Sequence, residues 1–264
     1  GSEIFMGDNG FTVGREQKII VFGGTGFLGS ALLGTLSTKN IVLITREPAH
    51  DVMGCVNILY SDIGSARQFG NFDLALDFSS HVSVEDFLDN PQTAFLDNID
   101  ILIKNIRCLS DIGFTGKYVY ISTDRALVNV EDNLYANDVS INCDPYGASK
   151  LIGELIVKYA GSLGWTIPTV IRFPNLYGSG QRSKQLIPSI LVNLNQGTHD
   201  IEIGSKSGSR NYLHVNDAVE ALKRYVTNPI DIQNLCISGE EVKIATILES
   251  FIEIHWIFIC SMIS

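Results

Sequence analysis

Phe22-Gly23-Gly24-Thr25-Gly26-Phe27-Leu28-Gly29 is the stretch that decides the fold class, because it directly follows an apolar run and opens a helical pattern. Gly23 permits a tight turn, Gly26 lets the backbone approach a pyrophosphate, and Gly29 lets the helix pack close to a sheet. Free N–H groups at the start of that helix suit an anion. The stretch therefore predicts a dinucleotide-binding turn after the first strand of a Rossmann-type sheet. Its expected cofactor contacts are Gly23, Thr25, Gly26, Phe27, Leu28 and Gly29.

Apolar runs alternate with helix-like segments through the first two thirds of the chain. The runs are residues 18–22, 40–45, 56–60, 73–78, 117–122 and 166–172. Several are apolar without alternation, as expected of parallel strands that helices cover on both faces. The pattern predicts an α/β fold with a Rossmann-type doubly wound parallel sheet over residues 18–174. Residues 1–17 are expected to be a flexible leader, and residues 175–264 a smaller C-terminal substrate-binding lobe, interleaved with the Rossmann domain.

Composition narrows the classes of function. Nineteen Lys and Arg oppose 29 Asp and Glu, so the net charge of -10 argues against a nucleic-acid partner. Five scattered cysteines without a CxxC pair favour free thiols in a reducing, cytoplasmic compartment, and no metal site is expected. The apolar residues 244–263 include Glu249, Glu253 and His255, so we expect a packed helix and no membrane span.

The end of the second expected strand, Leu43-Ile44-Thr45-Arg46, bears on which nucleotide is bound. An acidic residue there would hydrogen-bond the ribose 2′-hydroxyl of NAD, whereas a guanidinium can pair with the 2′-phosphate of NADP. Because Arg46 stands at this place, NADP(H) is the favoured cofactor. Glu47 next to it keeps NAD(H) open.

A candidate proton-transfer pair lies in Asp144-Pro145-Tyr146-Gly147-Ala148-Ser149-Lys150. Tyr146 and Lys150 are four residues apart at the start of an amphipathic helix, so they share one helix face. A phenol is a poor acid or base at neutral pH, but a nearby ammonium stabilises the phenolate and lowers the pKa of the phenol. The pair can then exchange a proton with a carbonyl or an alcohol.

A tyrosine and a lysine at this spacing also occur by chance, so the pair indicates a catalytic site only together with a third motif. That motif is Val119-Tyr120-Ile121-Ser122-Thr123-Asp124, an expected strand that ends in hydroxyls and a carboxylate. Rossmann-type sheets bind ligands at the carboxyl ends of their strands. Thr123 or Ser122 could hydrogen-bond the reacting oxygen, and a strand-end turn or helix cap is the alternative interpretation.

With these motifs in this order, the chain resembles the NAD-dependent epimerase/dehydratase family of extended short-chain dehydrogenases/reductases, which act on nucleotide sugars. Further matching stretches are Asn90-Pro91 through Phe95 and Asn98, Arg172-Phe173-Pro174-Asn175-Leu176-Tyr177-Gly178, and Arg210-Asn211-Tyr212-Leu213-His214-Val215-Asn216-Asp217. The resemblance covers roughly residues 18 to 240. It implies a Rossmann fold, a nicotinamide cofactor and a nucleotide-diphosphate sugar as the partner, and a homodimer is an open expectation.

The resemblance also implies roles for particular residues. The catalytic set would be Thr123, Tyr146, Lys150 and Asp124. Asp62 and Ile63 would flank the adenine, and the inner cofactor site would contain Phe78, Ser79, Ser80, Asn98, Ile121, Tyr146, Lys150 and Phe173. The substrate would contact Ser80, Thr123, Asn175, Arg182 and Arg210, the two arginines serving its diphosphate.

Two departures from the family pattern guide the choice of reaction. Many 4,6-dehydratases of the family carry Thr-Asp-Glu, whereas here Arg125 follows Asp124, and an arginine cannot deprotonate to serve as a base. A related dehydratase group carries Thr-Asp-Lys, so Asp124-Arg125-Ala126 keeps dehydration as a weaker alternative. Family members also continue beyond the strand expected at residues 234–238, so we expect a shortened substrate lobe.

The leading hypothesis is therefore reduction of a 4-keto nucleotide sugar by NADPH. Epimerisation at carbon 4 is the main enzymatic alternative and needs the same three residues. The non-enzymatic alternative is a regulatory or scaffold protein that binds the cofactor without turnover. It stays open because the fold alone does not decide between an enzyme and a binding protein.

Overall fold

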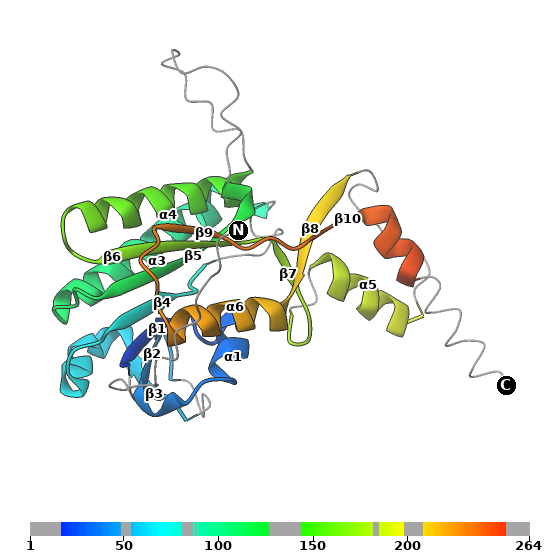
Figure 1. Ribbon diagram of the computed structural model, residues 1–264. Coiled ribbons are helices and arrows are strands. Elements are labelled where there is room, and N and C mark those ends of the chain that lie inside the picture. Colours follow the sequence, from blue (N-terminus) through cyan, green and yellow to red (C-terminus); the bar gives the residue numbers. More distant parts are fainter. Residues whose placement is uncertain are drawn as a thin grey trace, which may run out of the picture.

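The computed structural model describes residues 17–48, 54–80, 87, 89–126, 144–181, 185–197 and 208–251. Seven of the strands in these ranges form one parallel sheet in the order β3-β2-β1-β4-β5-β6-β9 (Figure 1). They are β1 (Ile19–Phe22), β2 (Ile41–Thr45), β3 (Val56–Leu59), β4 (Leu74–Asp77), β5 (Lys117–Thr123), β6 (Ile167–Phe173) and β9 (Asn234–Cys236). This confirms the predicted doubly wound sheet, whose strand order changes direction between β1 and β4.

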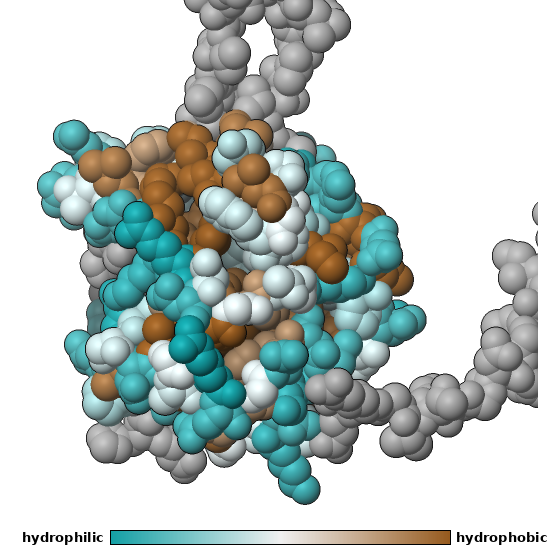
Figure 2. All heavy atoms as spheres, turned by 90° about the vertical axis from the view of Figure 1, so that its left-hand side faces the viewer, coloured by the Kyte–Doolittle hydropathy of each residue, from teal (hydrophilic) through white to brown (hydrophobic). Residues whose placement is uncertain are grey.

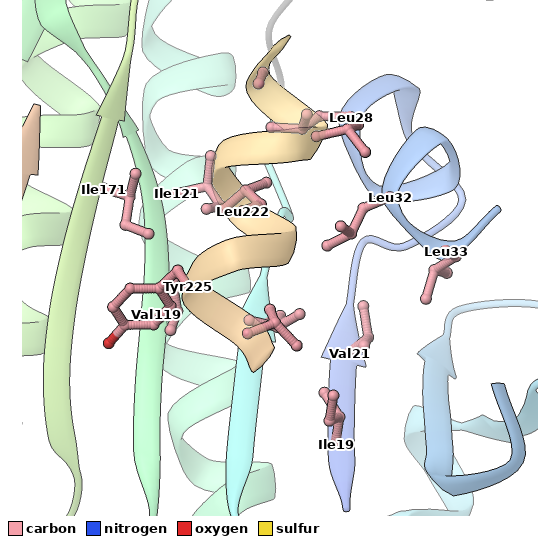
Figure 3. Packing of buried hydrophobic residues seen from close by; sticks show 14 of the residues in the cluster. Ile19, Val21, Leu28, Leu32, Leu33, Val119, Ile121, Ile171, Leu222 and Tyr225 are labelled. Carbon is pink, nitrogen blue, oxygen red and sulfur yellow. The ribbon is translucent and has the colours of Figure 1, made fainter. Parts of the chain in front are cut away.

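Helices cover both faces of this sheet. They are α1 (Phe27–Leu33) and α6 (Val215–Thr227) on one face, and α3 (Pro91–Asp111) and α4 (Pro145–Ser162) on the other (Figure 1). Successive residues of β1 point to opposite faces: Ile19 and Val21 pack under α1 and α6 (Figure 3), while Ile20 and Phe22 pack under α3 and α4. The run is apolar without alternation because neither face of the strand meets water.

A second, smaller sheet has the strand order β10-β8-β7. It consists of β7 (Asn175–Tyr177), β8 (Ser209–His214) and β10 (Glu240–Lys243), with α5 (Leu186–Asn195) beside it in Figure 1. These strands were not among those expected from the sequence, because they are short and rich in polar residues. Between β8 and β10 the chain returns to the large sheet through α6 and β9, so the strands of the two sheets alternate along the chain. Residues 244–251 are helical, and the rest of the helix expected at 244–263 lies outside the described residues.

Three further findings concern these described ranges. No helix in them is long and apolar enough to cross a membrane. They contain no group of three or more His, Cys, Asp or Glu placed to hold a metal ion. Cys55, Cys108 and Cys236 are free thiols there, whereas Cys143 and Cys260 lie outside the described residues.

Candidate active site

The glycine loop between β1 and α1 passes very close to the end of β4. Gly23 has a φ of +68°, and a Cβ on it would lie 2.6 Å from the backbone nitrogen of Ser79. A Cβ on Gly29 would lie 2.8 Å from the Cα of Gly24, and no side chain caps α1 at Gly26. The loop thus presents bare backbone and uncapped N–H groups, which fits the phosphates of a dinucleotide.

A buried aspartate organises the end of β4. The side chain of Asp77 is almost fully buried, and its Oδ1 accepts a hydrogen bond of 2.8 Å from the N–H of Ser79. Its Oδ2 accepts one of 2.8 Å from Asn105 Nδ2 and another from the hydroxyl of Tyr118. Burial and the charge of Asp77 hold the pKa of Tyr118 well above its usual value. This network fixes the turn that faces Gly23, and the sequence analysis did not single out Asp77.

Tyr146 lies in the first turn of α4, and it contacts the turn that follows β4. The Tyr146 side chain hydrogen-bonds with Ser80, and its ring packs edge-on against Phe87 with the centroids 5.7 Å apart. Burial raises the pKa of Tyr146 to about 12, while the bond with Ser80 and the charge of Arg125 act in the opposite direction. The pKa of the phenol is thus raised and not lowered as the spacing of Tyr146 and Lys150 led us to expect, and the phenol is protonated at neutral pH.

Lys150 lies one turn further along α4 and is buried. Its Nζ lies 4.4 Å from the centroid of the Tyr120 ring, a cation–π contact. Burial lowers the pKa of Lys150 to about 8, whereas the charges of Asp77 and Glu154 raise it. Tyr120 is the register partner of Asp77 between β5 and β4, so the ammonium lies over the part of the sheet that carries this buried carboxylate. Lys150 is charged at pH 7.

Glu154 fastens α4 to the strands beneath it. Its side chain is 1% exposed, and its Oε1 accepts hydrogen bonds of 2.7 Å from Ser122 Oγ and 2.7 Å from Arg172 Nε. Because Ser122 belongs to β5 and Arg172 to β6, this carboxylate fixes the helix over the ends of both strands. Glu154 was not among the residues expected from the sequence, although its place four residues after Lys150 puts both on one helix face.

A pocket of about 290 Å³ opens between the end of β5 and the small sheet. It is lined by Asp124, Arg125, Asn175, Ser209, Arg210 and Asn211. Thr123 Oγ1 donates a hydrogen bond of 3.2 Å to Asp124 Oδ1, and burial raises the pKa of Asp124 above its usual value. The structure thus brings together Asp124, Asn175 and Arg210 from the expected site, whereas Arg182 lies outside the described residues.

The other residues expected at the cofactor come from several elements of the large domain. Arg46 is exposed directly after β2, and Asn98 is buried on α3, where it donates a hydrogen bond of 3.0 Å to Ser149 Oγ. Exposed or partly buried positions are held by Thr25, Phe27, Asp62, Ile63, Phe78 and Ser80, of which Asp62 and Ile63 belong to η2 (Tyr60–Phe69). Buried positions are held by Leu28, Ser79, Ile121 and Phe173.

Two relatives of known function show what kind of protein this chain is similar to. The dTDP-D-glucose 4,6-dehydratase of Dictyostelium discoideum is 29% identical over 245 residues, which cover 78% of this chain and 54% of that protein. The GDP-6-deoxy-D-talose 4-dehydrogenase of Aggregatibacter actinomycetemcomitans is 25% identical over 230 residues, which cover 83% of this chain and 74% of that protein. This chain therefore spans about half of the length of the first relative, and both relatives are enzymes.

A solved structure and a family model agree with this likeness. The structure of RMD from Pseudomonas aeruginosa, complexed with NADPH, has a TM-score of 0.69 at 22% identity and covers 91% of this chain and 85% of that chain. It shares the fold. The model of the NAD dependent epimerase/dehydratase family matches residues 19–244. The resemblance seen in the sequence is confirmed, and this chain belongs to the NAD dependent epimerase/dehydratase family.

Proposed function

We propose that this protein reduces the 4-keto group of a nucleotide-diphosphate sugar, with NADPH as the hydride donor and Tyr146 as the proton donor. One observation carries the proposal. A Cβ on Gly23 would lie 2.6 Å from the backbone of Ser79, and the next residue, Ser80, hydrogen-bonds with Tyr146. The phenol is therefore separated from the phosphate loop by a single turn, as hydride and proton transfer to one carbonyl group require.

NADPH, when bound, supplies the hydride that the sugar carbon receives. Tyr146 gives its phenolic proton to the carbonyl oxygen, so that hydride and proton together convert the ketone to an alcohol. Thr123, at the end of β5, orients the same oxygen with its hydroxyl. The Lys150 ammonium, charged at pH 7, favours the phenolate that proton donation leaves behind.

Reduction is preferred to dehydration because of the residue after Asp124. Elimination needs a base next to this aspartate, and Arg125 cannot deprotonate to provide one. Arg46, exposed after β2, suits the 2′-phosphate of NADPH, a cofactor that reductions consume. The relative named GDP-6-deoxy-D-talose 4-dehydrogenase supports carbon 4 of a 6-deoxy sugar as the reacting position.

The substrate diphosphate is assigned to the small sheet. Arg210 of β8 lines the pocket next to Asp124 and Asn175, and a guanidinium matches phosphate oxygens with two parallel hydrogen bonds. Arg182 is proposed as a second contact. In this arrangement the sugar lies in the pocket near Thr123, and the nucleotide extends along the small sheet.

We further propose that the protein forms a homodimer through α3 and α4. Leu155 and Tyr159 on α4 are 59% and 64% exposed, and Leu96 on α3 is 49% exposed. A mostly apolar groove of about 330 Å³ lies between the two helices. Figure 2 shows apolar side chains gathered over the upper part of its face, on the side where α3 and α4 cover the sheet in Figure 1. Exposed patches of this kind mark association surfaces, so Tyr159→Glu should halve the mass measured by analytical ultracentrifugation.

The test of the reaction uses two substrates. With a 4-keto-6-deoxy nucleotide sugar, NADPH should be oxidised in a one-to-one ratio to the sugar that is reduced. With ordinary 4-hydroxy nucleotide sugars, no interconversion of the epimers should occur. Epimer interconversion without net change in the absorbance of added cofactor would replace the reductase by a 4-epimerase. Absence of both reactions across a panel of nucleotide sugars would favour a cofactor-binding protein without turnover.

A further inference from the structure

Arg125 makes two contacts that the proposed chemistry has not used. Its Nε lies 2.9 Å from Asp144 Oδ2 in an ion pair, and its Cζ lies 6.0 Å from the centroid of the Tyr146 ring. Arg125 belongs to η3 (Asp124–Ala126), directly after Thr123, whereas Asp144 is the N-cap residue of α4. One side chain therefore joins the strand end that carries the hydroxyl to the helix start that carries the phenol.

Backbone contacts hold this side chain in place. A Cβ on Gly147 would overlap the carbonyl oxygen of Arg125, so the first turn of α4 packs directly on η3. The N–H of Arg125 donates a hydrogen bond of 3.3 Å to Thr123 Oγ1, and Asp144 Oδ1 accepts one of 2.9 Å from the N–H of Gly147. A partly exposed ion pair alone would fix the guanidinium only weakly. Here the packing of the two backbones defines where it lies.

We propose, on the basis of the reduction assigned above, that Arg125 is a positioning residue for Tyr146: its guanidinium, held by the packing of η3 on α4, faces the ring and stabilises the phenolate that proton donation leaves. Arg125 thus has a role that does not require it to lose a proton. An acidic residue at this place would have the opposite effect on the phenolate.

The charges around the phenol have opposing effects on its pKa. The titratable or charged groups that act on it from the described elements are Asp124 and Arg125 of η3, Asp144 of α4 and Tyr120 of β5, and Lys150 lies one turn further along α4 over the Tyr120 ring. Arg125 lowers the pKa of Tyr146, whereas Asp144 and Asp124 raise it. The two partners of the ion pair therefore act on the phenol with opposite sign.

This opposition separates an electrostatic role from a merely structural one. Arg125→Met and Asp144→Asn both break the ion pair, and asparagine keeps the N-cap of α4 because its side chain still accepts a backbone hydrogen bond. If the guanidinium acts through its charge, Arg125→Met raises the pKa of Tyr146 by about one pH unit and Asp144→Asn lowers it. Arg125→Lys keeps the charge and should leave the pKa close to that of the unaltered protein.

The pKa is measured by fluorine NMR on the full chain, with a fluorinated tyrosine incorporated at position 146 alone. Its phenol is more acidic than that of tyrosine, which brings the titration into a range where the protein stays folded. NADPH oxidation is measured separately on the variants with ordinary tyrosine. Turnover should fall by up to about tenfold in Arg125→Met, the largest effect that a rise of about one pH unit in the pKa can have, and recover for the most part in Arg125→Lys.

Shifts of opposite sign in Arg125→Met and Asp144→Asn would support the proposal. Shifts of the same sign, or no shift in either variant, would overturn it. If Arg125→Met does not fold, the decrease expected in Asp144→Asn and the unchanged value expected in Arg125→Lys still decide the matter. The titration needs no substrate, so its result stands even if the unaltered protein oxidises NADPH with none of the sugars offered. That failure would refute the proposed reductase activity and leave the effect of Arg125 on Tyr146 unchanged.

Discussion

Gly23→Ala should lower the free energy of unfolding by about 2 to 4 kcal/mol, for two separable reasons. The φ of +68° places an alanine in the left-handed region, which costs roughly 1 kcal/mol. The added Cβ would also lie 2.6 Å from the nitrogen of Ser79 and 2.8 Å from the carbonyl carbon of Phe78. Both atoms are backbone, so the loop or the end of β4 must shift, at a further cost of about 1 to 3 kcal/mol.

Gly113→Ala is the matched control, because Gly113 has a φ of +73° but no heavy atom lies within 4 Å of a Cβ built on it. It should show the conformational cost alone, about 1 kcal/mol. Urea unfolding of both variants, followed by circular dichroism, gives the comparison, and NADPH titration should show loss of affinity only in Gly23→Ala. Equal destabilisation of the two variants, with cofactor affinity intact in both, would refute the reasoning that the loop must approach β4 closely.

Three further predictions concern the chemistry and the cofactor. Tyr146→Phe should preserve folding and NADPH affinity yet lower turnover by at least about a hundredfold, and near-normal turnover in steady-state assays would exclude Tyr146 as the proton donor. Arg46→Ala should raise the Kd for NADPH by roughly tenfold and leave the Kd for NADH nearly unchanged, since only NADPH offers a 2′-phosphate. Equal losses of affinity for the two cofactors in a fluorescence titration would make Arg46 an ordinary surface residue. Burial lowers the pKa of Lys150 from 10.5 to about 8. Between pH 8 and pH 10 the unfolded chain therefore binds more protons at Lys150 than the folded chain does. The folded state gains stability as the pH rises through this window. Lys150→Met removes this gain, so its free energy of unfolding, relative to the unaltered protein, should fall across that window; a constant difference would contradict the buried ammonium.

Most of the large sheet could be predicted from the sequence because strands such as β1 and β2 are apolar and buried on both faces. Each of the six apolar runs is a strand within one residue of its predicted ends, and the strand expected at residues 234–238 is β9, which ends at Cys236. The strands of the small sheet could not be predicted, because runs such as Ser209–His214 mix polar and apolar residues and resemble loops. Their pairing depends on contacts between segments far apart in the chain, with β8 joining β7 on one side and β10 on the other.

For the site, sequence spacing predicted which residues share a helix or a strand end, but not which elements face each other. Tyr146 and Lys150 follow from helix periodicity. The ion pair of Arg125 with Asp144 joins two motifs that are distant in sequence, and the Asp77 network depends on three different elements. The charged residue that ends the buried strand β4 was the available signal for Asp77, since a carboxylate there must find hydrogen-bond partners.

The proposed function requires that hydride passes from NADPH to carbon 4 of a sugar in the site that contains Tyr146. The most direct test supplies NADPH carrying deuterium at carbon 4 of the nicotinamide, in each of its two stereospecific forms, together with a 4-keto-6-deoxy nucleotide sugar. One of the two forms should transfer its deuterium to carbon 4 of the product, as mass spectrometry and NMR would show. Product that carries no deuterium with either form, or carries it at another carbon, would contradict the account.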